Sequence, residues 1–389
     1  MRDVAIIGIG ETKFGELWES SLRDLGIEAG FKAMEDAGLS GKDIDAMFVG
    51  NMSAGQLIDQ EHIAPLIADY SGMAENNLPA IRIEAASASG GLALSQGYMA
   101  VASGVHDIVV VGGAEKMTDV GDETAGEILA KTSDQEWEAV FGATLGSLYA
   151  MMARRHMKDF GTTKEQLAAV AVKNHLNASM NPNAQFRRAI KPEMVLNSPM
   201  VASPLGTFDC APLSDGAAAV ILAPLDKAKK YSDCPIKILS CGQGGDYMAL
   251  HDRDSLTRME ATVVAAKKAF KYGGIKPKDV QLAEVHDNFT ITEIMAIEDI
   301  GFFKKGQGGK ATEDGQTALN SKISVNTSGG LKAKGNPVGA VGVAQAVEAV
   351  VQLRGEAGDR QVDKAENALL HNIGGTGSTA IVHLLGRCG

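Results

Sequence analysis

The sequence of 389 residues contains no long apolar run. A membrane-spanning helix needs about 18 to 20 consecutive apolar residues, and no segment approaches that length. The chain begins almost at once with a strand-like stretch at residues 4–7, without a basic leader, an apolar stretch and a cleavage site. We therefore expect a soluble, cytoplasmic protein that does not associate with a membrane.

Cysteine is scarce, and its positions are scattered: Cys210, Cys234, Cys241 and Cys388. No pair has the Cys-x-x-Cys spacing of a metal site, and a chain of this size does not depend on a disulfide framework. We expect reduced thiols and no metal. Cys210, within the segment 208–212, is interpreted as a core residue.

A basic excess is also absent, since the formal net charge is −11. Proteins that bind nucleic acid normally carry a surplus of Lys and Arg, so the charge argues against that class. Glycine, by contrast, is abundant, with 45 residues. Many of these glycines end strand-like segments, as in an enzyme with many tight strand-to-helix turns.

An internal repeat organises the chain. Residues 35–49 resemble residues 271–285, and Gly38 and Asp43 align with Gly274 and Asp279 at the same spacing. Each copy follows a strand-like segment and a segment with helical periodicity. Each half therefore starts strand, helix, strand, which predicts a mostly parallel sheet with helices on its faces.

The repeat extends further along the chain. Residues 88–91 are similar to residues 327–330, and each half closes on a glycine-rich turn and a β-like run, at 216–222 and 377–385. The first half carries an insertion at about residues 118–198. Residues 150–200 hold eight Lys and Arg against three Asp and Glu. This excess fits either a phosphate-rich ligand or a solvated helical surface.

Six ordered motifs carry a family resemblance, at residues 84–91, 112–117, 214–219, 286–289, 329–339 and 371–377. Together they resemble the thiolase superfamily over the whole chain, and His-Asp-x-Phe at 286–289 is similar to the sterol-carrier-protein type and its archaeal relatives. The resemblance implies a duplicated, five-layer α-β-α-β-α fold of class α/β. It also implies acetyl-CoA acetyltransferase-like chemistry, either thiolytic cleavage or Claisen condensation.

The resemblance and the repeat together give predicted boundaries. The N-terminal half comprises residues 1–118 and 199–233, and the C-terminal half comprises residues 234–389. Residues 119–198 form an inserted loop domain that covers coenzyme A. By resemblance, coenzyme A or acyl-CoA is a substrate or ligand, and no tightly bound cofactor is expected.

The position of the family's acyl-accepting cysteine holds Ser87. A helix N-terminus lowers the pKa of a thiol there, whereas a hydroxyl needs a strong neighbouring base. The family's activating histidine is replaced by Asn336, which cannot take a proton. The second acid/base, a cysteine at one of two places in the family, is replaced at both, by Asn288 and Asn372.

The remaining site residues point to binding. By resemblance, His286 holds a thioester oxygen, and the backbone N–H groups of Ser87 and Gly374 form a second oxyanion site. The alternative for His286 is a satisfied histidine at a strand end, and a structural role is favoured for His371. Arg187 and Arg188 are candidate contacts for the phosphates of coenzyme A, or ordinary surface residues.

Three functions stay open at this point. We prefer a thiolase-like acyl-CoA-binding protein whose ordinary turnover is lost or altered. The second is an active acetyl-CoA C-acyltransferase, and the third is a serine hydrolase of thioesters. The resemblance also implies a homodimer or a dimer of dimers, and a complex with a hydroxymethylglutaryl-CoA synthase and a small OB-fold protein.

Overall fold

The computed structural model describes residues 2–388, and its centre is one ten-stranded sheet in the order β10-β9-β11-β12-β8-β1-β7-β4-β2-β3. The two halves of the chain meet where β1 pairs with β8. The N-terminal half contributes β1 (Val4–Glu11), β2 (Ala46–Gly50), β3 (Ala80–Ile83), β4 (Val109–Glu115) and β7 (Gly216–Pro224). The C-terminal half contributes β8 (Ile236–Gly245), β9 (Leu282–Glu284), β10 (Ser324–Val325), β11 (Asn367–Gly374) and β12 (Thr379–Arg387).

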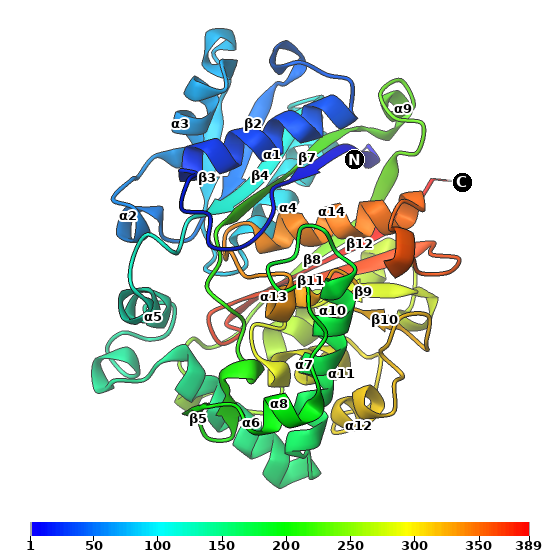
Figure 1. The fold of residues 1–389 in the computed structure, drawn as a ribbon. Helices are drawn as coiled ribbons and strands as arrows, with labels where there is room; N and C mark the ends of the chain where they lie inside the picture. Colours follow the sequence, from blue (N-terminus) through cyan, green and yellow to red (C-terminus); the bar gives the residue numbers. More distant parts are fainter. Residues whose placement is uncertain (1, 389) are drawn as a thin grey trace.

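Helices cover the outer faces of the two halves of this sheet, and further helices lie between the halves (Figure 1). The N-terminal half has α1 (Leu22–Asp36), α2 (Ala54–Leu57), α3 (Ile63–Tyr70), α4 (Ser89–Ser103) and α9 (Leu225–Ala228). The C-terminal half has α10 (Glu260–Gly273), α11 (Thr290–Asp299), α12 (Gly308–Glu313), α13 (Gly330–Ala333) and α14 (Val341–Arg354).

Three large apolar clusters define five layers. The middle cluster packs α4 against α14 between the strands of the two halves, and Figure 1 shows these helices side by side. The outer clusters pack α1 and α3 on one half and α10 and α11 on the other. Neighbouring strand residues alternate between layers, so that Leu370 joins the middle cluster and Leu369 an outer one. The predicted five-layer fold is confirmed.

The prediction of a mostly parallel sheet is wrong. Four strand pairs are parallel and five are antiparallel. The closing strand of each half, β7 or β12, lies between two strands that run in the opposite direction. In the C-terminal half the cause is local, because β11 turns directly into β12 without the crossover helix that parallel strands require.

The internal repeat is visible in the backbone. Gly38 and Gly274 both adopt a left-handed conformation, with φ of 63° and 69°. The carboxylates of Asp43 and Asp279 each accept a hydrogen bond at 2.9 Å from the backbone N–H three residues earlier. One predicted match fails: residues 329–330 open only the four-residue α13, and the long helix of that half begins at Val341.

The segment predicted as an inserted domain is mainly helical. It holds α5 (Asp122–Ala130), α6 (Leu145–Phe160), α7 (Lys164–Ser179) and α8 (Pro192–Leu196), and a small hairpin of β5 (Met200–Ala202) and β6 (Leu205–Gly206) follows. Helices α6 and α7 pack against α11 of the C-terminal half. The domain boundaries 119 and 198 stay a prediction.

Candidate functional site

Ser87 lies in a tight turn between β3 and α4, and only 5% of its surface is exposed. The residue before it, Ala86, has φ of 51°, a left-handed conformation that costs a residue with a side chain about 1–2 kcal/mol. Ser89 holds this turn, because its hydroxyl accepts from the N–H of Ala85 at 2.9 Å and donates to the carbonyl of Ala86 at 2.6 Å. The turn places Ser87 at the positive end of α4.

No side chain in residues 2–388 makes a hydrogen bond to the hydroxyl of Ser87. Neither His286 nor His371 makes a hydrogen bond to it. The hydroxyl therefore keeps its proton, and the turn presents a neutral group.

His286 follows β9 and is fully buried. Both of its ring nitrogens are without a hydrogen-bond partner. Burial, with His371 nearby as a smaller cause, lowers the pKa of His286 to about 3. The ring is therefore neutral at physiological pH, with one N–H free to donate and one nitrogen free to accept.

His371, on β11, is a supporting residue. Its Nε2 lies 2.9 Å from the hydroxyl of Thr262, and its Nδ1 accepts a weak hydrogen bond from the N–H of His286 at 3.5 Å. Burial lowers the pKa of His371 to about 3. Both nitrogens of this ring have partners, and the structural role of His371 stays a prediction.

Two asparagines present unsatisfied amide oxygens. The backbone N–H of Asn336 donates to the hydroxyl of Ser214 at 2.8 Å, while its Oδ1 is buried without a partner. The Asn372 side chain donates from Nδ2 to Gln345 at 2.9 Å, and its Oδ1 is also unpaired. Because unpaired buried polar atoms are rare and costly, these oxygens are candidate ligand contacts.

Asn288 is tied to an unpredicted residue, Tyr149 of α6. The Oδ1 of Asn288 accepts from the hydroxyl of Thr292 at 3.0 Å. Burial raises the pKa of Tyr149 to about 12, and a hydrogen bond with the Asn288 side chain opposes that rise. The Tyr149 ring stacks on Phe289 with centroids 4.6 Å apart. Nothing in the sequence distinguishes Tyr149 from other apolar positions of its helix.

Gly374 ends β11 and packs against the Ser87 turn. A Cβ atom at this position would lie 2.6 Å from the carbonyl oxygen of Ala85, so only glycine fits. The turn that follows is held from two sides, because Tyr149 donates to the carbonyl of Gly375 and Arg253 donates to the carbonyl of Thr376 at 2.8 Å. A cavity of about 360 Å³ opens between this turn and residues 84–86.

Arg187 and Arg188 are exposed and follow α7. The segment before them runs beside the Asn336 loop, since Gln185 N–H donates to the carbonyl of Lys334 at 2.8 Å and Phe186 N–H donates to that of Ala333 at 3.1 Å. Their contact with phosphates stays a prediction.

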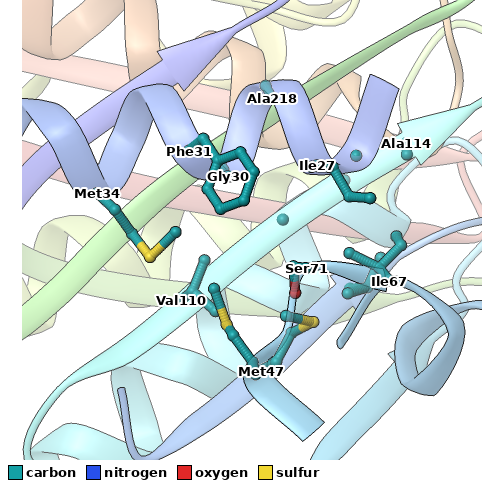
Figure 2. A pocket seen from close by; sticks show the side chains of 16 residues that line it. Ile27, Gly30, Phe31, Met34, Met47, Ile67, Ser71, Val110, Ala114 and Ala218 are labelled. Atoms are coloured by element: carbon teal, nitrogen blue, oxygen red, sulfur yellow. The ribbon is translucent and has the colours of Figure 1, made fainter. Parts of the chain in front are cut away.

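A second hollow lies in the outer layer between α1, α3 and the sheet (Figure 2). Phe31, Met34, Met47 and Ile67 line it, and its volume is about 30 Å³. No titratable side chain lines it. It has room for about one small molecule of the size of water and cannot hold a thioester.

Comparison with known proteins identifies this arrangement. The family model for the thiolase N-terminal domain matches residues 4–226, and that for the thiolase C-terminal domain-like family matches residues 242–387. The chain belongs to the thiolase family. A Methanothermobacter thermautotrophicus protein named acetyl-CoA acetyltransferase is 59% identical over the full length of both chains. One of that name from Methanocaldococcus jannaschii is 52% identical over 99% of each chain.

Sterol-carrier relatives and solved structures agree with this thiolase assignment. Chicken (Gallus gallus) sterol carrier protein 2 is 33% identical over 98% of this chain and 71% of its own length. The Ltp2-ChsH2(DUF35) aldolase superimposes with a TM-score of 0.84 and 27% identity, covering 99% of this chain and 97% of that one. The Ascaris suum Acat5 thiolase in complex with coenzyme A shares the fold, with a TM-score of 0.75, 21% identity and full coverage of both chains.

The described part of the chain lacks two kinds of feature, a membrane-spanning helix and a metal-binding cluster. Across residues 2–388, no helix combines the length and the apolar character that a bilayer crossing requires. Within the same residues, His, Cys, Asp and Glu form no cluster of three or more that could hold a metal ion.

Proposed function

We propose that this thiolase-family chain binds a CoA thioester but does not carry out ordinary thiolysis or Claisen condensation. The observation that carries the proposal is the set of buried, unpaired polar atoms on His286, Asn336 and Asn372. They can hold a polar ligand. The two amides cannot take up a proton, and burial lowers the pKa of His286 to about 3, which makes its neutral ring a weak base.

In this proposal the thioester oxygen accepts a hydrogen bond from the neutral ring of His286. The N–H groups of Ser87 and Gly374 form the second oxyanion site, because the two turns that carry them lie against each other. The amide groups of Asn336 and Asn372 contribute further polar contacts. Asn288, whose side chain lies beside the hydroxyl of Tyr149, supplies another amide group.

In this proposal the protein lacks ordinary turnover, because Ser87 and Asn336 occupy the positions of the family's nucleophile and activating histidine. A serine without a base stays protonated. Even if an acyl group reached Ser87, the resulting oxygen ester would be less activated than a thioester. The carbanion attack that forms the carbon–carbon bond would then be slower than the same attack on the cysteine thioester of the family's reaction.

A second candidate is an active acetyl-CoA C-acyltransferase. The names of the two archaeal relatives favour it, since they cover the whole chain at 59% and 52% identity. A serine thioesterase has less support, because neither ring nitrogen of His286 makes a hydrogen bond to any protein atom, Ser87 included.

We also propose a protein partner. Three large side chains are solvent-exposed, Trp137 by 65%, Phe141 by 78% and Tyr247 by 61%. Exposed apolar patches of this kind mark interaction surfaces. A structural neighbour was solved with a DUF35 component. A complex with a small OB-fold protein and a hydroxymethylglutaryl-CoA synthase, around a homodimeric core, is the partner set we propose.

Incubation with acetyl-CoA tests the function. We expect calorimetry to detect binding of acetyl-CoA. The intact mass of the protein should not change, because Ser87 takes no acyl group, and a thiol assay should detect no release of free CoA. Release of CoA that depends on His286 would support the acyltransferase instead. A stable acyl adduct on Ser87 would support the thioesterase, and absence of any binding would remove the proposal.

A further inference from the structure

The cavity of about 360 Å³ beside the Ser87 turn is lined by several neutral polar side chains. They belong to Ser53, Gln56, Thr132, Ser378 and Thr379. A water molecule takes about 30 Å³ of liquid volume, so the cavity has room for an acyl chain of several atoms. Because polar groups that lose water need a new hydrogen-bond partner, this lining favours a ligand that is itself polar.

The position of the cavity relates it to the proposed thioester site. Ala85 and Ala86, which precede Ser87, form part of its wall, and Gly374 and Gly375 form another part. A thioester oxygen bound by the N–H groups of Ser87 and Gly374 would bring its carbonyl carbon between these two turns. The cavity is then the space that receives the rest of the acyl group. In this respect the inference rests on the proposed function.

Lys131, at the C-terminal end of α5, is the only cation among the described residues that line this cavity. Its segment lies close to the thioester turn, because a Cβ atom on Gly375 would be 2.4 Å from the carbonyl oxygen of Thr132. The Nζ of Lys131 donates to the amide oxygen of Gln56, which is neutral, and no carboxylate in residues 2–388 pairs with it. Its charge is therefore available to an anionic ligand.

Two carboxylates near Lys131 leave its charge unpaired. Glu127 is four residues earlier on α5, a spacing that suits an ion pair, yet the ammonium bonds Gln56 instead. Glu84 also lines the cavity, and its carboxylate accepts from the backbone N–H of Ala86. The one acidic group of the cavity is thus engaged by the backbone, while the one cation has only an amide as its partner.

A neighbouring hollow of about 590 Å³ has the opposite character. Lys131 borders it too, but three carboxylates line it, those of Asp122, Glu123 and Glu127. These charges repel an anion from that side. Gln56, which holds the ammonium, lines only the cavity beside Ser87. An anionic group therefore binds most favourably in that cavity.

We propose that the acyl group of the bound thioester carries a carboxylate at its far end, and that Lys131 and Gln56 bind this carboxylate. A lysine has three N–H donors, and the bond to Gln56 uses one of them, so two remain for the ligand. The amide of Gln56 donates a further hydrogen bond. The substrate class is the CoA thioester of a dicarboxylic acid.

The test compares two thioesters of equal chain length by calorimetry on the full chain. Glutaryl-CoA carries a terminal carboxylate, and pentanoyl-CoA carries a methyl group in its place. We expect glutaryl-CoA to bind about fivefold more tightly, which is the effect of one well-formed ion pair in contact with solvent. This preference should shrink as the salt concentration rises, because salt screens the charges.

Three variants complete the test. Lys131→Met should abolish the preference and leave the affinity for pentanoyl-CoA unchanged, whereas Lys131→Arg should keep the preference. Lys268→Met is the matched control, because Lys268 is exposed, donates to the neutral carbonyl of Gln243 at 2.9 Å and does not line the cavity. Equal affinities of the unaltered protein for the two thioesters, or a preference that Lys131→Met leaves intact, would overturn this inference alone. Failure of both thioesters to bind would overturn the proposed function, and this inference with it.

Discussion

The hydroxyl of Tyr149 donates a hydrogen bond of 2.7 Å to the carbonyl oxygen of Gly375. This bond joins α6, in the predicted inserted domain, to the turn between β11 and β12. The acceptor lies one residue after Gly374, whose N–H belongs to the proposed second oxyanion site. We propose that Tyr149 positions the backbone of this turn for the proposed oxyanion site.

Tyr149→Phe removes only this hydroxyl. We expect acetyl-CoA to bind about fivefold more weakly, a loss of about 1 kcal/mol, while the affinity for free CoA stays the same. Calorimetry with both ligands measures the difference. Tyr272→Phe, at an exposed position, is the control. An equal loss for both ligands would show that Tyr149 supports only the fold.

Gly374→Ala should destabilise the protein, because the added Cβ meets the carbonyl of Ala85 at 2.6 Å. We expect a loss of about 2 kcal/mol in the free energy of unfolding, measured by urea denaturation. Gly126→Ala is the matched control. It lies inside α5 with no atom within 4 Å of the added Cβ, and it should gain about 0.5 to 1 kcal/mol. Similar effects at both glycines would contradict the close packing of the two turns.

Ser87→Cys combined with Asn336→His and Asn288→Cys should introduce thiolase turnover, because together these changes restore the family's nucleophile, its activating histidine and one of its two positions for the second acid/base. The helix N-terminus lowers the pKa of the new thiol, and the histidine supplies the base. The rate of CoA-dependent cleavage of acetoacetyl-CoA measures the gain. Ser87→Cys alone should accept an acetyl group, which intact-mass measurement would detect. Its turnover should be at least about tenfold slower than that of the combined variant, because it lacks the activating histidine. If the triple variant folds but stays inactive, the loss of these three groups does not explain the absence of turnover.

The stability of the protein should fall in acid through His286. Its folded-state pKa of about 3 lies below the ordinary value of 6.5. Between these values the unfolded chain binds a proton that the folded chain does not, so stability is lost as the pH falls below about 6.5. One such group contributes up to about 1.4 kcal/mol per pH unit.

His286→Asn should therefore flatten the dependence of unfolding free energy on pH by about this slope between about pH 4 and 6. Urea denaturation at several pH values measures it. His62→Asn is the control, because His62 is exposed and asparagine tolerates its left-handed backbone, with φ of 57°. An equal change in both variants would contradict the buried, neutral state of His286.

Much of the fold was predictable because its signals are local. Gly38 and Gly274 each terminate a helix in a left-handed conformation, and Asp43 and Asp279 each cap a short turn, so the duplication left matching residues in the sequence. Strand direction was not predictable in the same way. The antiparallel placement of β7 and β12 depends on which strands become neighbours, which alternation along the chain does not specify.

The sequence by itself determined the residue types of the site, since Ser87, His286, Asn288, Asn336 and Asn372 lie in recognisable motifs. Only the tertiary structure decided which of their atoms are satisfied. The partners of an imidazole or an amide come from distant segments, as His371 shows with Thr262. For the same reason Tyr149 carries no sequence signal, because its burial and its hydrogen bond to Gly375 arise only when the layers pack together.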